Sequence, residues 1–329
     1  MKSFRLSPSA VRLGTAAALT LACAAVSAQP YPTRPVRIVV PQAPGGGLDI
    51  AVRAVANKLT EDWGQQIIVD NRPGANGIIG IEQVAKSRPD GYTLSAAFTS
   101  LLTVNPNVYK SLPYDVAHDF APVTQLVTNT IVLVVNPYLP ARSVKELVAL
   151  ARAHPGDLTY GSFGIGNLTH LAGELLSIEA RLKMVHVPYK GETPSVTDLI
   201  GGQVFLLFAT APGVAGHVQN GRLRMLATCG EKRAIAYPDM PTMIESGYPK
   251  VVVTGWSALV APAGTPQEIV HKVQRDSARH LMSPELRERL SAIGAEPVAS
   301  TPEQFAAFIK SETDKWLPVI MAAGVYRTQ

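Results

Sequence analysis

The stretch Ile38-Val39-Val40-Pro41-Gln42-Ala43-Pro44-Gly45-Gly46-Gly47-Leu48-Asp49 decides how the rest of this chain folds. An apolar, β-branched run ends at Pro41, three glycines follow, and from Asp49 apolar residues recur at helical spacing as far as Trp63. The pattern predicts a strand, a glycine loop and a helix. Glycines let the backbone approach a ligand closely, and the first turn of a helix offers unpaired N–H groups at the positive end of its dipole. The stretch is therefore typical of an anion site, although a tight turn alone would use the same glycines.

The same arrangement returns in the middle of the chain. Leu158-Thr159-Tyr160 leads into Gly161-Ser162-Phe163-Gly164-Ile165-Gly166-Asn167, and apolar residues from Leu168 to Leu182 then mark one face of a helix. Two such loops facing each other would suit a ligand with a carboxylate, held by backbone N–H groups and by the hydroxyls of Ser162 and Thr169.

The order of elements predicts an α/β fold of two lobes, each a mainly parallel sheet flanked by helices, with a ligand cleft between them. Strands expected at 36–40, 66–70 and 93–98 alternate with helices at 49–63 and 78–86. No flexible linker separates the lobes, so we expect the chain to cross on strands near 123–136 and return near 252–262. These crossings place lobe 1 at 29–130 and 255–329 and lobe 2 at 131–254.

The N-terminus has the pattern of a cleavable signal peptide over residues 1–28, which predicts a secreted protein. Lys2, Arg5 and Arg12 precede the apolar run 13–26, and small residues follow it. Cys23 raises the alternative of a lipoprotein, but Thr20 stands where such a signal normally carries an aliphatic residue.

Removal of this segment changes the composition in a way that disfavours several function classes. The net charge falls from +5 to about +2, because three positive charges and no negative ones are lost, and nucleic-acid binding loses its main support. Cys229 is then the single cysteine, and the seven histidines show no metal-ligand spacing. We expect no metal, no cofactor and no nucleic-acid partner.

Catalytic patterns are also weak. Gly161-Ser162-Phe163-Gly164 lacks the glycine two residues before the serine that a nucleophile elbow requires. The sequence offers no recognisable nucleophile–base pair or metal set, so we do not expect an enzyme. A secreted enzyme on the same scaffold stays as the third hypothesis.

The expected ligand contacts come from the two glycine loops and the residues beside them. The main ones are Gly45, Gly46, Ser162, Gly164, Thr169 and His170, with Asp49 and Lys190 as secondary ones. Asp49 would repel a bound anion from the first helical turn, so we expect it to cap or structure its loop. For His170, the alternative to ligand contact is a structural or solvent-facing role. For Lys190, the alternative is a solvated lysine at the surface.

Several motifs in order along the chain resemble the Bug family, the periplasmic solute-binding proteins of tripartite tricarboxylate transporters. They are the opening stretch Val40 to Asp49, Asn71-Arg72-Pro73-Gly74-Ala75, Pro89-Asp90-Gly91-Tyr92-Thr93-Leu94, Leu112-Pro113-Tyr114-Asp115, His170-Leu171-Ala172-Gly173-Glu174, His186-Val187-Pro188-Tyr189-Lys190-Gly191 and Ala261-Pro262-Ala263-Gly264-Thr265-Pro266. The resemblance covers about Tyr31 to Gly324. It implies two α/β lobes that close on a small carboxylated solute, with the first glycine loop and the loop before the His170 helix gripping carboxylate oxygens. It also implies delivery to a membrane permease, although many members have none nearby.

One departure from that family bears on the ligand. Relatives often carry an Asp after the Phe of one strand, whereas here Ala209 and Thr210 follow Phe208. If that acid receives an ammonium group in relatives, its absence argues against an amino-acid ligand. The leading hypothesis is thus a monomeric binding protein for a dicarboxylate, a tricarboxylate or an aromatic acid, and the second is a periplasmic sensing subunit that signals to a membrane kinase.

Overall fold

The computed structural model describes residues 31–329, so the signal peptide predicted over residues 1–28 lies outside the described part of the chain. Residues Arg34–Gln329 form one compact unit. Among residues 31–329 we find no helix with the length and the apolar character that crossing a bilayer requires.

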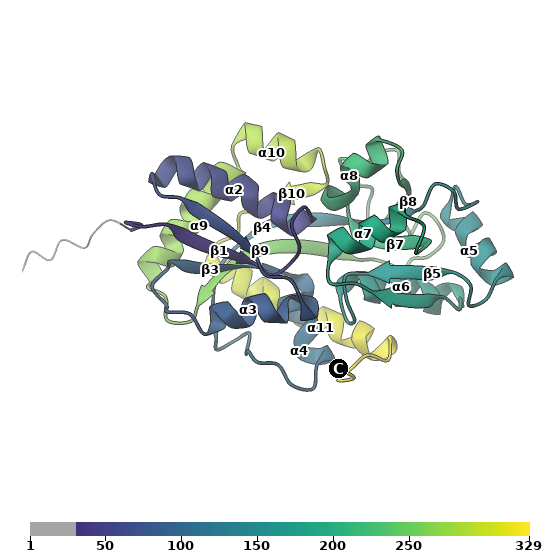
Figure 1. Ribbon diagram of the computed structural model, residues 1–329, viewed down its shortest axis with the longest axis horizontal. Coiled ribbons are helices and arrows are strands. Elements are labelled where there is room, and N and C mark those ends of the chain that lie inside the picture. The colour runs from purple at the N-terminus through teal and green to yellow at the C-terminus, as the bar shows by residue number, and fades with distance from the viewer. Residues whose placement is uncertain (1–30) are drawn as a thin grey trace, which may run out of the picture. The chain divides into compact units, whose positions relative to one another are not determined.

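A single β-sheet organises residues 34–329, with its strands in the order β2-β1-β3-β9-β4-β7-β5-β6 (Figure 1). Two further strands, β10 and β8, also pair with β4. The strands are β1 (Val36–Val40), β2 (Ile67–Asn71), β3 (Thr93–Phe98), β4 (Phe120–Val135), β5 (Thr159–Ser162), β6 (Val185–Pro188), β7 (Leu206–Thr210), β8 (Arg224–Thr228), β9 (Thr254–Pro262) and β10 (Ala295–Pro297).

The sheet contains both parallel and antiparallel strand pairs, in the half with β1 and β3 and in the half with β5 and β7. The parallel pairs expected from the β-α-β order are present, because β1 pairs with β2 and β3, and β5 pairs with β6 and β7. Every antiparallel pair involves β4 or β9. The chain leaves the first half along β4 and returns along β9, so these two strands run in opposite directions through the centre of the sheet (Figure 1).

The partners of β4 change abruptly along its length. Thr130 lies opposite Thr254 of β9, whereas the next residue, Ile131, lies opposite Thr210 of β7. The first part of β4 therefore belongs to the half of the sheet that contains β1 and β3, and its last part belongs to the half that contains β5 and β7.

Helices cover both faces of the sheet, and Figure 1 shows α2, α7 and α8 on the side opposite α3, α6 and α11. The helices are α2 (Gly47–Trp63), α3 (Ile78–Ala85), α4 (Asn105–Val108), α5 (Val144–Ala153), α6 (Leu168–Ala180), α7 (Glu192–Ile200), α8 (Ala211–Gln219), α9 (Gln267–Leu281), α10 (Pro284–Ser291) and α11 (Pro302–Ala322), with short turns η1 (Ala75–Gly77) and η2 (Ser100–Val104).

The core lies on both sides of the central strands. On β7, Leu206 and Phe208 join the cluster packed under α5, α6 and α11, while Leu207 and Ala209 join the cluster under α7 and α8. This alternation follows from the period of two along a strand. It explains why these strands are continuous apolar runs in the sequence, with no polar face.

Candidate functional site

A small cleft of about 40 Å³ lies where the two halves of the sheet meet. It is lined by residues that follow β1, β3, β5 and β7 and by the middle of β4 and β9. They are Gln42, Leu48, Phe98, Thr99, Ser100, Asn129, Ile131, Phe163, Asn167, Leu168, Thr169, Thr210, Gly255, Trp256 and Ser257. Crevices at the carboxyl ends of parallel strands are common ligand sites in α/β folds.

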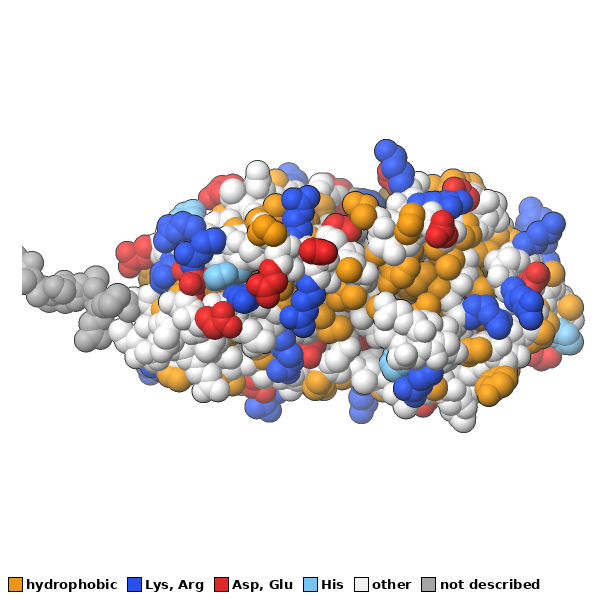
Figure 2. All heavy atoms as spheres, turned by 90° about the horizontal axis from the view of Figure 1, so that it is seen from above, with side chains coloured by type: hydrophobic (Ala, Val, Ile, Leu, Met, Phe, Trp, Pro, Cys, Tyr) orange, Lys and Arg blue, Asp and Glu red, His pale blue; other side chains and the backbone are white. Residues whose placement is uncertain are grey.

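No residue that lines this cleft carries a charged side chain. On the outer face seen in Figure 2, Lys and Arg side chains are instead interspersed with Asp and Glu, and neither sign dominates. The polar groups in the cleft are hydroxyls and amides, which offer hydrogen bonds without net charge. A ligand here would be held by neutral groups.

The N-termini of two helices reach the cleft. Leu48 lies in the first turn of α2, and Leu168 and Thr169 open α6. The chain turns into α6 through Gly164 and Gly166, whose φ values of 138° and 72° favour glycine. Both N-termini border the cleft, and that of α6 presents the positive end of its dipole there, which favours an anion.

The first glycine loop is held by Asp49. Its Oδ2 accepts a hydrogen bond from the Gly45 N–H at 3.0 Å and one from Arg53 Nε at 2.9 Å, and its Oδ1 accepts one from Asn71 at 2.9 Å. Burial would raise the pKa of Asp49, but the bonds from Arg53, Gly45 and Asn71 outweigh it and lower that pKa. Asp49 thus structures the loop and does not line the cleft, and Gly45 is exposed and lines a different pocket.

The N-terminus of α2 is already bonded to a carboxylate of the chain. The Gly47 N–H donates to Glu192 Oε2 at 2.8 Å, while the N–H and the hydroxyl of Thr210 donate to Oε1 at 2.8 and 2.6 Å. Glu192 is 3% exposed. Burial raises the pKa of Glu192, and its hydrogen bonds with Thr210 and Gly47 lower it less. Sequence patterns gave no sign of this residue, because only the folded chain brings α7 to the first loop.

The second glycine loop uses its own polar side chains. Thr169 Oγ1 accepts a bond from the Phe163 N–H at 3.0 Å, Ser162 Oγ accepts one from the Gly164 N–H at 3.2 Å, and His170 Nδ1 accepts one from the Gly166 N–H at 3.2 Å. These bonds fix the loop that leads into α6. Of the residues predicted to contact a ligand, Thr169 alone is among those that line the cleft.

The structure brings together a serine and a histidine that the sequence analysis did not pair. Ser162 Oγ lies 2.6 Å from His186 Nε2, a contact between residues 24 positions apart that no local pattern indicated. Ser162 is completely buried and does not line the cleft. Burial, with a smaller contribution from His170, lowers the pKa of His186 to about 3. The low pKa keeps this imidazole uncharged at neutral pH and makes it a weak base for taking a proton from serine.

His186 should make the protein sensitive to acid. Its pKa is lower in the folded chain than the usual 6.5, so the unfolded chain takes up the proton first as the pH falls. Allowing for its partial exposure, we expect the free energy of unfolding to fall by about 1 kcal/mol between pH 7 and pH 5 through this group. Denaturant titrations at both pH values measure this, and His186→Gln should flatten the dependence. His271→Gln, at an exposed position, is the control; equal slopes for His186→Gln and wild type would contradict the assignment.

Lys190 lies at the edge of the site. It is exposed, and it lines a small side pocket that shares Gln42, Phe98 and Phe163 with the cleft. Lys190 therefore lies beside the cleft and is not among the residues that line it. In residues 31–329 there is no group of three or more His, Cys, Asp or Glu residues placed to hold a metal ion.

Most of the polar lining comes from residues that the sequence analysis did not select. They are Gln42, Thr99, Ser100, Asn129, Asn167, Thr210 and Ser257. Asn129 and Ser257 could have been selected from the sequence, because each is a polar residue within a largely apolar strand. Asn129 Nδ2 donates to Ser257 Oγ at 2.8 Å, while its buried Oδ1 has no partner among the described residues. A buried polar atom without a partner is typical of a site that a ligand or a water completes.

Hydrogen bonds join the two sides of the cleft. The Leu168 N–H donates to Ser100 Oγ at 2.8 Å, and Asn167 Nδ2 donates to Asn76 Oδ1 at 2.8 Å. On the other side of α2, Thr193 Oγ1 donates to the Pro44 carbonyl at 2.6 Å. Direct hydrogen bonds therefore connect the two sides of the cleft in this structure.

A family model and a related protein each match most of this chain. The family model described as "Tripartite tricarboxylate transporter family receptor" matches residues 51–325. Protein BugT of Bordetella pertussis is 38% identical to this chain over 302 residues, which cover 92% of this chain and 93% of BugT.

Two solved structures are similar over nearly their whole length. One is described as R. palustris Rpa4515 with adipate; it is 35% identical, has a TM-score of 0.88, and the match covers 90% of this chain and 99% of that one. The other, MatC (Rpa3494) from Rhodopseudomonas palustris with bound malate, is 28% identical with a TM-score of 0.83, over 88% of this chain and 100% of that one. The two-lobed α/β fold predicted from the sequence is confirmed.

Proposed function

Because the chain belongs to the receptor family of the tripartite tricarboxylate transporters, we propose that it captures a small carboxylate in its cleft and delivers it to the membrane subunits of such a transporter. The observation that carries this proposal is the cleft itself, where the N-terminus of α6 lies among uncharged hydrogen-bond donors. Backbone N–H groups at helix N-termini bind carboxylates without a positive side chain. The family is periplasmic, and a signal peptide at residues 1–28 is part of the proposal.

Within the site, we propose that Thr169 and the first turn of α6 contact the ligand, together with Asn129 and Ser257 on the opposite wall. The other predicted residues of the glycine loops then act indirectly. Ser162, Gly164 and His170 fix the shape of the second loop, and Asp49 that of the first. Lys190 would attract an anion toward the entrance.

The lobes meet, in this proposal, at residues 130/131 and 254/255. The change of partner between Thr130 and Ile131 supports that division, since each part of β4 is bonded to a different half of the sheet. β4 and β9 would then serve as the hinge about which the lobes open to admit the ligand.

The ligand class is narrowed by the relatives and by the lining. The bound molecules in the two similar structures, adipate and malate, are both dicarboxylates. No acidic side chain lines the cleft here, and Ala209 is buried in the core under α7 and α8. An ammonium group would find no negative partner, so we propose a dicarboxylate that is not an amino acid.

A thermal-shift screen tests the binding function. The chain from residue 29 is refolded to remove carried ligand and heated with dicarboxylates, tricarboxylates, aromatic acids and amino acids. At ten times its dissociation constant, a ligand that binds only the folded state stabilises it by about 1.4 kcal/mol. We expect malate or adipate to raise the melting temperature more than aspartate or glutamate does.

Matched compounds make the screen decisive. The diamide of the same dicarboxylate should give no shift, because it lacks the negative charge that the N-terminus of α6 favours. A folded protein that no acid stabilises would contradict the proposal. The transporter partner is tested separately, by identifying the membrane proteins that co-purify with the ligand-loaded chain, where a kinase instead of a permease would support a sensing role.

A further inference from the structure

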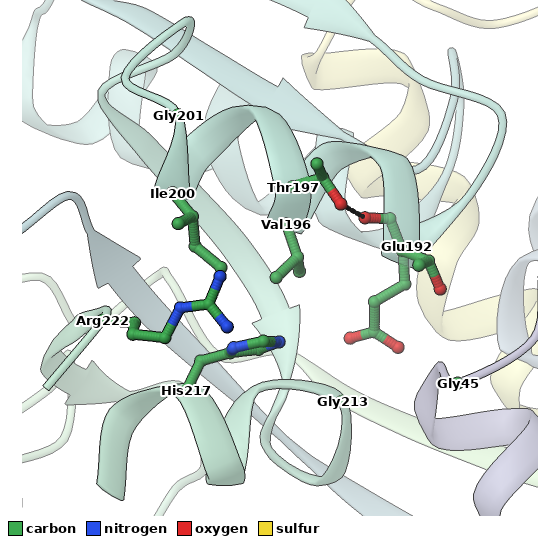
Figure 3. A pocket seen from close by; sticks show the side chains of 10 residues that line it. Gly45, Glu192, Val196, Thr197, Ile200, Gly201, Gly213, His217 and Arg222 are labelled. Atoms are coloured by element: carbon green, nitrogen blue, oxygen red, sulfur yellow. Dashed lines mark hydrogen bonds between the residues drawn. The ribbon is translucent and has the colours of Figure 1, made fainter. Parts of the chain in front are cut away.

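Glu192 places a carboxylate of the chain itself at the N-terminus of α2. Figure 3 shows its side chain extending from α7 into the space between Gly213 of α8 and the loop that contains Gly45. Both oxygens accept an N–H, Oε2 from Gly47 and Oε1 from Thr210, which is the arrangement that an ionised carboxylate makes. Three helix N-termini, those of α2, α7 and α8, come together at this point.

The surroundings fit the carboxylate closely. A Cβ atom added at Gly213 would lie 2.4 Å from Glu192 Cδ, and one added at Gly46 would lie 2.9 Å from Oε2. Neither glycine has a positive φ, so backbone conformation does not require glycine there. Glycine at these two positions leaves space for the Glu192 carboxylate; the backbone conformation does not require it.

These contacts connect the two sides of the cleft. Glu192 and Thr193 belong to α7, in the part of the chain after β4, whereas their partners Gly47 and Pro44 belong to the first glycine loop. Thr210, which lines the ligand cleft, binds the same carboxylate. The bonds to Gly47 and Pro44 would break if the lobes opened about β4 and β9.

We propose that Glu192 is a latch: its carboxylate takes the place of a ligand anion at the N-terminus of α2, holds α7 against the first glycine loop, and stabilises the closed cleft. Glu192 is then a positioning residue for ligand binding, since it keeps Thr210 and the start of α2 in the geometry that the ligand meets. Only the expected effect of Glu192 on ligand affinity rests on the proposed function. Whether Glu192 holds the cleft closed can be measured without a ligand.

The first test measures opening in the absence of ligand. Cysteines introduced by Glu61→Cys on α2 and Lys145→Cys on α5 carry a fluorescent donor and acceptor; Glu61 and Lys145 are exposed, and native Cys229 is buried and will not label. In Glu192→Gln one carboxylate oxygen becomes an NH₂ group, which cannot accept a bond. We expect a larger distance between the labels in this variant than in wild type. Glu231→Gln, the same change at an exposed position, is the control and should match wild type.

The second test asks whether the cradle itself recognises a carboxylate. Glu192→Ala leaves the three helix N-termini without their anion, so millimolar acetate should restore the closed distance in Glu192→Ala but not in Glu192→Gln, where the space is filled. Gly213→Ala should open the cleft in the wild-type background, because the new methyl group collides with Glu192. In the double variant Glu192→Ala, Gly213→Ala, acetate should have no effect.

The outcomes separate the latch from the binding function. Equal ligand-free distances in wild type and Glu192→Gln would overturn the latch, whatever the protein binds. If the latch is correct and adipate binds, the dissociation constant for adipate should rise about tenfold in Glu192→Gln through the smaller closed population. A distance change with no binding of any acid would retain the latch and contradict the proposed function.

Discussion

Replacing Asn129 with aspartate should weaken the binding of a dicarboxylate by about 3 kcal/mol, or about two orders of magnitude in Kd. Asn129 lines the cleft, is 3% exposed, and holds its Oδ1 without a partner. An aspartate has nearly the same shape, and it can accept a bond from the Ser257 hydroxyl that now receives one from Asn129. The added negative charge would lie about 5 Å from a ligand carboxylate, where repulsion at an effective dielectric constant of about 20 has this size.

Calorimetric titration of wild type, Asn129→Asp and Asn129→Ala separates charge from the loss of a hydrogen bond. Asn129→Ala removes the amide without adding charge, so we expect a loss of about tenfold or less. The titrations are done well above pH 7, where the aspartate is ionised, and circular dichroism checks that each variant is folded. Equal affinities in Asn129→Asp and Asn129→Ala would place the ligand carboxylate away from β4.

Local patterns were sufficient to predict the elements around the site. The strand Val36–Val40 and the strand Thr93–Phe98 have the bounds expected from their apolar runs, and the glycine loop leads into α2 as predicted. Strands expected near 123–136 and 252–262 are also present, as β4 and β9. Such features depend on residues close in sequence, whose spacing directly reflects the period of a strand or helix.

Contacts between distant residues could not be predicted in the same way. Gly47 and Glu192 are 145 positions apart, and nothing in either local sequence indicates that they bond. Ser162 and His186 meet because β5 and β6 are parallel neighbours: His186 lies opposite Tyr160, and Ser162 is two residues farther along β5 on the same face. Polar residues of the loops were the predicted ligand contacts. Several of those side chains instead accept hydrogen bonds from backbone N–H groups of the second loop. Hydroxyl and amide side chains from strands, such as those of Asn129 and Ser257, line the cleft.

Gly173→Ala should destabilise the protein by about 3 kcal/mol, because the position has no room for a methyl group. Gly173 lies in the middle of α6, and an added Cβ would lie 2.3 Å from Cε2 of Tyr160. Tyr160 is completely buried on β5, stacks against His186, and donates from its hydroxyl to Glu174 at 2.5 Å. The ring cannot move aside without breaking these contacts, so α6 must shift instead.

Gly216→Ala is the matched control, since it makes the same substitution inside α8 at a position where nothing lies within 4 Å of the added Cβ. There the higher helix propensity of alanine should stabilise the protein by about 0.5–1 kcal/mol. Chemical denaturation of the two variants should therefore give changes of opposite sign. Because α6 begins at the cleft, Gly173→Ala should also weaken dicarboxylate binding under conditions where the protein is still folded, and unchanged affinity there would argue against the α6 N-terminus as the carboxylate site.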